Sequence, residues 1–309
     1  MKNFFAIIIL GFLLCGNTYA EKKSEDKKPK LRKELSCKYN PRCENFPKVK
    51  KIEGIKYPLT MVQKQKGEKP SGENYYIFHF KPKINKPSPY IVIIPSSGGI
   101  GQASAVTFKR YTDKLLNTGF GVIILDIFYN TGIKKGTVSR GPAASMGALS
   151  VIEFIKVRFP ELSNNKFGVM GGSRGGMTVL SLAGELIRDN YLYKNVNQWF
   201  NAGVAFYPSC GKQKLLMPVI VFIGELDEWL SPTNCKLWKQ RDEEQISSGL
   251  LQIFIYKNAH HGFNKELFKK LERSTSKNHD YAGRAYQYNE FADKDSETKM
   301  LDFFETRLN

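Results

Sequence analysis

The stretch GVMGGSRGGM, residues 168–177, places Ser173 between two pairs of glycines, directly after a short apolar run. Such a run predicts a buried strand, and the spacing of the apolar residues from Gly175 onward predicts a helix. A serine on a tight turn between strand and helix exposes its hydroxyl, and small residues two positions away on each side relieve the crowding. The alternative is a glycine-rich loop that contains a serine by chance, and the rest of the chain separates the two interpretations.

Short runs rich in Val, Ile and Phe recur along the chain. The alternating first run predicts a strand, and the unbroken runs predict strands buried on both faces of a parallel sheet. They lie at 75–80, 90–95, 120–128, 166–170, 202–208, 218–225 and 250–256. Helical spacing predicts helices at 108–119, 141–159, 175–187 and 299–308. This alternation predicts an α/β fold with a mainly parallel, doubly wound sheet flanked by helices. The short segment between Pro208 and Val219 leaves little room for a large lid domain.

A serine nucleophile needs a histidine that accepts its proton, and this chain offers few candidates. His79 falls inside the first predicted strand, where we expect a structural role, and His279 falls in a polar stretch. His260 and His261 follow the last strand, in YKNAHHGFN, which is where an α/β-hydrolase places its base. We favour His261 as the base, with His260 as the alternative.

The histidine in turn needs a carboxylate that orients it. Three carboxylates follow the strand at 218–225: Glu225, Asp227 and Glu228. We favour Asp227, because it lies three residues past Gly224 in the loop beyond the strand end. The chain order Ser173, Asp227, His261 is the order of the triad in α/β-hydrolases.

The anionic intermediate of acyl transfer needs two backbone donors. We expect one to be the N–H of Arg174, directly after the serine. The other should come from PSSGGIG, after the strand at 90–95, where we favour Ser97 over Gly98. The alternative for PSSGG is a flexible turn.

The first residues have the features of an export signal, and export to an oxidising compartment affects whether the cysteines form disulfides. Residues 1–20 combine Lys2, an apolar stretch too short for a comfortable membrane span, and a small-residue end at Ala20. We predict cleavage after Ala20, with an uncleaved membrane anchor as the alternative. Four cysteines then remain, and an even count in an exported chain favours disulfides. The two pairs that we expect are Cys37–Cys43 and Cys210–Cys235. A zinc site is the alternative, but no CxxC pair or nearby histidine favours it, so we expect no metal. The export signal and the disulfides together predict a periplasmic or secreted protein.

The net charge of +18 is concentrated near the start of the chain. Residues 21–70 hold 16 Lys and Arg against 7 Asp and Glu, with few aromatics. This composition predicts a solvated basic leader or linker, partly disordered, followed by one hydrolase domain at 71–309. A weak contact with an anionic surface through residues 21–70 is the alternative role, and no nucleic-acid motif accompanies the charge.

Several stretches together resemble the dienelactone hydrolase family of the α/β-hydrolase superfamily: IIPSSGGIG, DIFYNTG, GVMGGSRGGM, VAFYPSC, IGELDEWLSPTNC, YKNAHHGF and GRAYQYNEFAD. The resemblance runs from about Tyr90 to the end of the chain. VAFYP before Cys210 and GELDEWLSP before Cys235 resemble an exported branch of the family, which supports pairing of these two cysteines. The chain departs from the family at Ser173, where the namesake enzymes carry cysteine, and at Pro95-Ser96, where many relatives have His-Gly.

These observations predict an exported serine hydrolase that cleaves a small-molecule carboxylic ester or lactone through an acyl-enzyme. No metal or organic cofactor is expected for this chemistry. The alternatives are a serine peptidase of the same fold and a catalytically silent α/β-hydrolase-fold protein that binds a ligand or an anionic surface.

Overall fold

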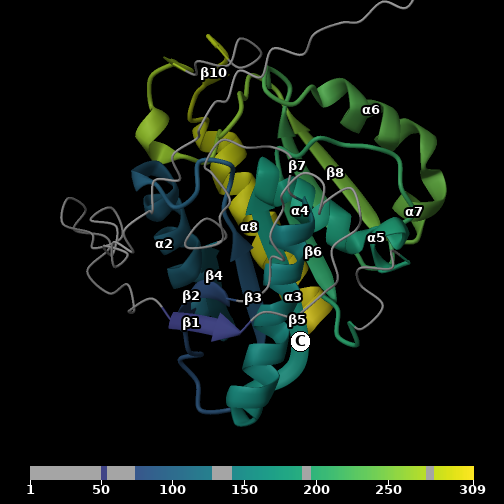
Figure 1. Cartoon of the computed structure of the whole chain (residues 1–309). Coiled ribbons are helices and arrows are strands. Elements are labelled where there is room, and N and C mark those ends of the chain that lie inside the picture. Colours follow the sequence, from purple (N-terminus) through teal and green to yellow (C-terminus); the bar gives the residue numbers. More distant parts are fainter. Residues whose placement is uncertain (1–49, 54–73, 127–140, 190–195, 276–281) are drawn as a thin grey trace, which may run out of the picture. The chain divides into compact units, whose positions relative to one another are not determined.

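An eight-stranded sheet forms the centre of the fold. The computed structural model describes residues 50–53, 74–126, 141–189, 196–275 and 282–309. The strands are β1 (Lys50–Glu53), β2 (Asn74–Phe80), β3 (Ser88–Ile94), β4 (Gly121–Asp126), β5 (Ser163–Gly172), β6 (Ala202–Phe206), β7 (Val219–Gly224) and β8 (Leu251–Tyr256). Their order across the sheet is β1-β2-β4-β3-β5-β6-β7-β8 (Figure 1). The pairs β1–β2 and β2–β4 are antiparallel, and every pair from β4 to β8 is parallel.

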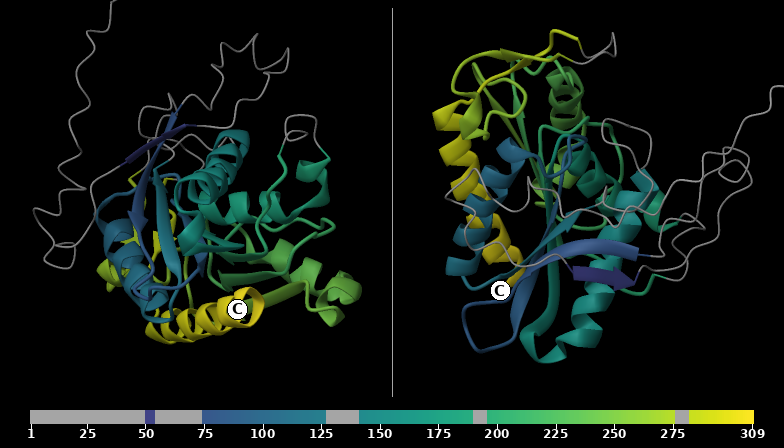
Figure 2. Two further views of the ribbon diagram at one scale, coloured as in Figure 1. Left: turned by 90° about the horizontal axis from the view of Figure 1, so that it is seen from below. Right: turned by 60° about the vertical axis from the view of Figure 1, so that its left-hand side comes forward.

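Helices cover both faces of this sheet. They are α2 (Gln102–Asn117), α3 (Gly141–Arg158), α4 (Arg174–Ala183), α5 (Glu185–Arg188), α6 (Pro232–Arg241), α7 (Glu243–Ser247) and α8 (Glu290–Leu308). The pair α2 and α8 packs on one face and the pair α3 and α4 on the other (Figure 2). A short hairpin, β9 (Glu272–Arg273) with β10 (Ala285–Tyr286), lies outside the main sheet. None of the helices in the described ranges is long and apolar enough to cross a membrane.

The predicted alternation of buried strands and helices is confirmed. Every residue of β3, β4, β6 and β7 is buried, as expected for strands covered on both faces. Because the strands from β3 to β8 run parallel, their carboxyl ends share one edge of the sheet. The loops at that edge carry Ser173, Asp227 and His261, and ligands of open α/β sheets bind at this edge.

Some elements differ from the sequence-based expectation. The helix expected at 175–187 is interrupted at Gly184, which adopts an extended conformation and forms a bridge to Leu215. Residues 50–53 fall within the stretch expected to be a leader, yet they pair with β2 as an edge strand. The helices α6 and α7 were not predicted. The last helix begins at Glu290, nine residues before the expected start, where the Asn289 side chain accepts from the N–H of Ala292.

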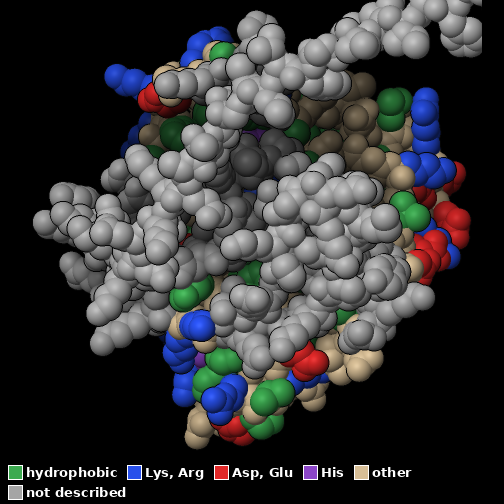
Figure 3. All heavy atoms as spheres, viewed as in Figure 1, with side chains coloured by type: hydrophobic (Ala, Val, Ile, Leu, Met, Phe, Trp, Pro, Cys, Tyr) green, Lys and Arg blue, Asp and Glu red, His purple; other side chains and the backbone are tan. Residues whose placement is uncertain are grey.

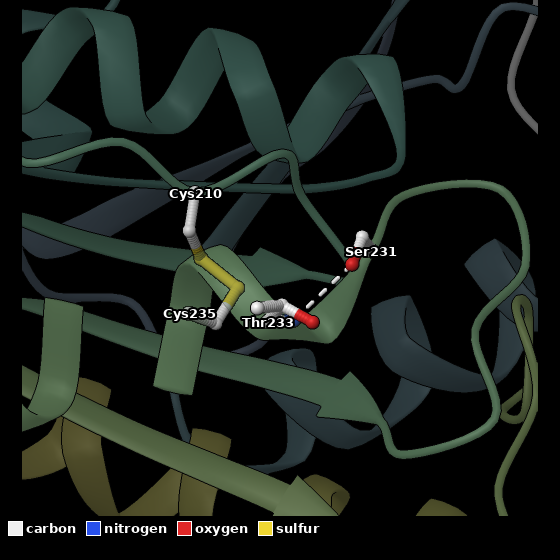
Figure 4. Close-up of a disulfide and its surroundings, with 4 residues drawn as sticks. All are labelled: Cys210, Ser231, Thr233 and Cys235. Atoms are coloured by element: carbon white, nitrogen blue, oxygen red, sulfur yellow. Dashed lines mark hydrogen bonds between the residues drawn. A yellow bond between two sulfur atoms is a disulfide. The ribbon is translucent and has the colours of Figure 1, made fainter. Parts of the chain in front are cut away.

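The expected disulfide between Cys210 and Cys235 is present. Cys210 follows β6, and Cys235 lies in the first turn of α6. Ser231 caps the start of this helix, because its side-chain oxygen accepts the Thr233 N–H at 3.3 Å (Figure 4). The bond therefore fastens the loop after β6 to the helix that follows the Asp227 loop. The other expected pair, Cys37–Cys43, lies outside the described residues.

Replacing both Cys210 and Cys235 with serine is expected to lower the free energy of unfolding by about 3 kcal/mol. The crosslink spans 25 residues, and a loop of that length constrains the unfolded chain by roughly this amount. Denaturant unfolding of the oxidised protein and the double variant measures the difference. An unchanged unfolding midpoint would contradict the prediction.

Candidate active site

Ser173 sits on a strained turn between β5 and α4. Its backbone has φ 56° and ψ −117°, a conformation that non-glycine residues rarely adopt. A Cβ on Gly171 would lie 2.5 Å from the carbonyl carbon of Gly175, so the turn closes only with glycine there. The N–H of Ser173 donates to the Phe206 carbonyl at 2.9 Å, which ties the turn to β6. Strain that the surrounding structure maintains is typical of functional sites.

His261 and Asp227 form a buried pair on the loops after β8 and β7. The His261 Nδ1 lies 2.8 Å from Asp227 Oδ2, and both side chains are almost fully buried. The other carboxylate oxygen of Asp227 accepts the N–H groups of Trp229 and Leu230 at 2.8 and 2.9 Å. These backbone bonds fix the carboxylate, which in turn fixes the ring of His261.

The competing candidates lie elsewhere. Glu225 pairs with Lys236 at 3.7 Å, and Glu228 accepts the N–H of Ala285 at 2.9 Å. The side chain of His260 has no hydrogen-bond partner within the described part of the chain. His79 is buried in β2 with its Nε2 3.2 Å from the Tyr90 hydroxyl, which fits the structural role expected for it. His279 lies outside the described residues. The geometry therefore favours Asp227 and His261.

Tyr207 connects the serine turn to the histidine loop. Its ring centroid lies 4.5 Å from that of His261, and its hydroxyl lies 2.8 Å from the position of a Cβ on Gly172. The hydroxyl donates to Asn264 Oδ1 at 2.9 Å, and the Asn264 amide donates to the Tyr111 hydroxyl at 2.8 Å. Asn264 is three residues from His261, so this chain of bonds anchors the histidine loop to β6 and α2.

An aromatic cluster lies on the solvent side of the same loop. The Trp229 ring stacks beside His261 with centroids 5.6 Å apart, and Tyr286 packs on Trp229 at 4.7 Å. The Arg284 guanidinium donates to the Trp229 carbonyl at 2.9 Å. The β9–β10 hairpin thus holds the Asp227 loop against the histidine loop. None of these residues was predicted to belong to the site, because a single sequence carries little signal for such contacts between distant loops.

Burial is the largest influence on the protonation of His261 and lowers its pKa. Asp227 acts in the opposite direction, while Lys265 and Arg284 lower the pKa further. The imidazole is therefore neutral at neutral pH, and its Nδ1–H donates to Asp227. Its Nε2 is then able to accept a proton, as a general base must.

The acidic limb of a pH profile of kcat/KM is expected to have its midpoint below pH 6.5. Protonation removes the base, and the pKa of His261 lies below its ordinary value of 6.5. Hydrolysis of a substrate without titratable groups, measured between pH 4 and 8, gives the midpoint. A midpoint clearly above pH 6.5 would contradict this reading of the site.

The two expected oxyanion donors lie in the segments that border Ser173. Arg174 is the first residue of α4, and the first turn of a helix directs N–H groups without helical acceptors toward its start. Ser97 lies in a turn closed by the Gly99 N–H and the Ser96 carbonyl at 2.9 Å. A Cβ on Gly175 would lie 2.2 Å from the Ile94 carbonyl oxygen, so the loop after β3 passes close to the serine turn.

A small cavity of about 20 Å³ borders the serine turn. That volume holds about one water molecule. Its polar lining includes Ser96, Thr107, Tyr111, Tyr207, Asn264 and Lys265. Burial lowers the pKa of the Lys265 ammonium to about 8. Among the described residues, no group of three or more His, Cys, Asp or Glu side chains could hold a metal ion.

Comparison with known proteins identifies the family of the chain. The model of the dienelactone hydrolase family matches residues 76–308. The chain belongs to the dienelactone hydrolase family. This membership confirms the enzyme class expected from the sequence, a dienelactone hydrolase-like carboxylic ester hydrolase. A search of curated protein sequences gave no significant match.

Solved structures related to this family have the same fold. A dienelactone hydrolase-like promiscuous phosphotriesterase from metagenomic libraries aligns with a TM-score of 0.56 and 19% identity, over 85% of this chain and 99% of the other. A Klebsiella pneumoniae protein assigned as a dienelactone hydrolase gives 0.55 and 17%, over 84% and 99%. A Thermogutta terrifontis esterase with bound propionate gives 0.53 and 14%, over 75% and 89%. The expected α/β-hydrolase fold is confirmed.

Replacing Tyr207 with phenylalanine is expected to lower kcat about tenfold with little change in KM. The ring stays in place, but the hydroxyl that holds Asn264 is lost, and a lost buried hydrogen bond costs about 1–3 kcal/mol. The matched control is Tyr90→Phe, which removes a buried hydroxyl beside His79, in the other half of the sheet. Both variants should lose stability, but only Tyr207→Phe should lose kcat. Equal kcat in the two variants would contradict a role in positioning His261.

Proposed function

We propose that this protein is an exported serine hydrolase that cleaves a small carboxylic ester or lactone through an acyl-enzyme. The observation that carries the proposal is the buried Asp227–His261 pair at the sheet edge that also carries the strained Ser173 turn. A serine, a carboxylate and a histidine in this chain order form the triad of α/β-hydrolases.

In the proposed mechanism, Ser173 Oγ attacks the acyl carbon while His261 Nε2 accepts its proton. The imidazolium that forms is stabilised by Asp227, whose second oxygen stays bound to Trp229 and Leu230. His261 passes the proton to the leaving alkoxide, and the alcohol departs. His261 then takes a proton from water, whose oxygen attacks the acyl-serine. The acyl–Oγ bond breaks, His261 returns the proton to Ser173 Oγ, and the acid is released.

The oxyanion of each tetrahedral intermediate is assigned to the N–H groups of Arg174 and Ser97. Such donors act on charge that develops only in the transition state, and loss of one donor costs roughly 10²–10³ in kcat. The dipole of α4 adds positive potential at the same point. Its ten-residue length gives it a full first turn of directed N–H groups.

Two features support the proposal that the protein is exported. The signal-like residues 1–20 and the buried Cys210–Cys235 disulfide support export to an oxidising compartment. We assign the chain to the periplasm or the exterior, with membrane anchorage by an uncleaved signal as the alternative.

A substrate panel tests this function. The panel contains p-nitrophenyl acetate, butyrate and octanoate, a simple lactone, and a peptide p-nitroanilide, each with and without prior dialysis against EDTA. We expect turnover of the esters and the lactone, and the same rates after EDTA. Preferential cleavage of the anilide would favour the peptidase alternative. A folded protein that turns over none of these substrates would favour the silent binding protein.

A further inference from the structure

A basic surface lies at the end of the sheet opposite the proposed active site. Strand β2 runs antiparallel to β4, so the loop after Phe80 lies where β4 begins. Helix α3 ends at the same side, because β5 starts shortly after it. The exposed basic side chains at this side are Lys81, Lys83 and Lys86 in the loop, Arg158 at the end of α3, and Lys50 of β1, whose ammonium reaches the ring of Phe159. We call these five residues the basic face.

None of the five residues of the basic face forms an ion pair within the described ranges. Exposed lysines elsewhere, such as Lys214 and Lys294, pair with carboxylates at 2.8 and 2.5 Å. The ammonium groups of Lys50 and Lys81 lie 5.6 and 5.2 Å from the centre of the Phe159 ring. Two charges therefore converge on one ring, although like charges repel.

The positive charges of Lys50 and Lys81 also affect a buried side chain, His79. His79 has its pKa lowered to about 4, first by burial and then by Lys50 and Lys81. A surface that carries one sign of charge attracts ions of the opposite sign, and the attraction weakens as the salt concentration rises. In Figure 3, Lys and Arg side chains lie at the lower end of the molecule, together with hydrophobic side chains and a few Asp and Glu side chains.

Two aliphatic side chains project within the basic face. Val157, beside Arg158, is 72% exposed, and Ile84, beside Lys83, is 39% exposed. Aliphatic groups among lysines suit the boundary between phospholipid headgroups and acyl chains. Stacking platforms for nucleic-acid bases are aromatic, and none of the large hydrophobic side chains exposed at this end, within the described residues, is aromatic.

We propose that the basic face docks on a bilayer of anionic phospholipid. The active-site edge of the sheet then points away from the bilayer toward water-borne substrate. Residues 21–49, which precede Lys50 in the sequence, also carry more Lys and Arg than Asp and Glu. Each basic side chain near such a surface raises the partition coefficient about fivefold.

Vesicle partitioning of the full chain tests this proposal. The vesicles contain phosphatidylcholine alone or with 30% phosphatidylglycerol. The face variant is Lys50→Gln/Lys81→Gln/Arg158→Gln. The matched control is Lys212→Gln/Lys239→Gln/Lys269→Gln, three exposed lysines outside the face. Residues 1–20 are the same in every protein, so their contribution cancels between the variants.

We expect the face variant to lose roughly 100-fold in partitioning to the anionic vesicles, while the control loses little. Ester hydrolysis and the thermal midpoint should be unchanged in both, and Val157→Ser should weaken binding further at high salt. Equal losses in the two triple variants would overturn the proposal. Partitioning that does not depend on phosphatidylglycerol would also overturn it, as would wild-type protein that binds a soluble polyanion but not the vesicles. The test is independent of the proposed function, because hydrolysis and partitioning are measured separately.

Discussion

Replacing Ser173 with alanine is expected to lower kcat for a short p-nitrophenyl ester by roughly 10⁴-fold or more. The hydroxyl is the proposed nucleophile, and no other group on the turn replaces it. The rate that remains comes from binding and from the oxyanion donors alone. Steady-state kinetics of the purified protein, with circular dichroism to confirm the fold, measures the loss.

Two further variants make this prediction sharper. Ser209→Ala removes an exposed serine from the loop after β6 and should leave kcat unchanged. Ser173→Gly should be as inactive as Ser173→Ala but at least as stable, because glycine adopts φ 56° without strain. Retention of more than about a tenth of the wild-type kcat in Ser173→Ala would remove Ser173 from the mechanism.

Replacing Asp227 with asparagine is expected to lower kcat by about 10⁴-fold with little change in KM. The backbone N–H groups of Trp229 and Leu230 hold one oxygen of Asp227, and they should hold the asparagine oxygen in the same way. The amide nitrogen then faces His261 Nδ1, where two donors oppose each other. The clash of the two donors is relieved when the His261 proton moves from Nδ1 to Nε2. In that tautomer Nε2 cannot accept the proton of Ser173.

The neighbouring carboxylates provide matched controls for Asp227. Glu225→Gln and Glu228→Gln change the same loop, but their partners are Lys236 and the hairpin residue Ala285. Each should keep kcat within a fewfold of the wild type. A larger loss of kcat in either variant than in Asp227→Asn would show that the sequence-based assignment of the acid was wrong.

The sequence predicted the parts of this site that depend on local order along the chain. The serine turn needs glycines at fixed offsets, and the acid and the base follow particular strands, so the sequence alone predicts Ser173, Asp227 and His261 as the site. Tyr207 and Asn264 were not found, because their roles depend on a contact between the loops after β6 and β8. Hydrophobic periodicity carries no information on such contacts.

In the fold, too, the elements marked by a local sequence pattern were predicted, and those that depend on contacts with distant residues were not. Buried strands were recognised because they are unbroken apolar runs, and β3 and β7 lie within one or two residues of their expected starts. Strand β1 was missed because its sequence KKIE is mostly charged, and pairing with β2 alone makes it a strand. Helices α6 and α7 were missed because few of their residues are buried, so no apolar stripe marks them.

The most direct test of the account is the site of covalent labelling by a fluorophosphonate. Trypsin cleavage after Lys166 and Arg174 isolates residues 167–174, a peptide in which Ser173 is the single hydroxyl-bearing residue. The account predicts that mass spectrometry finds the phosphonyl group on this peptide, and that prior incubation with a short ester slows its attachment. A folded protein that stays unlabelled, or that carries the label elsewhere, would contradict Ser173 as the nucleophile.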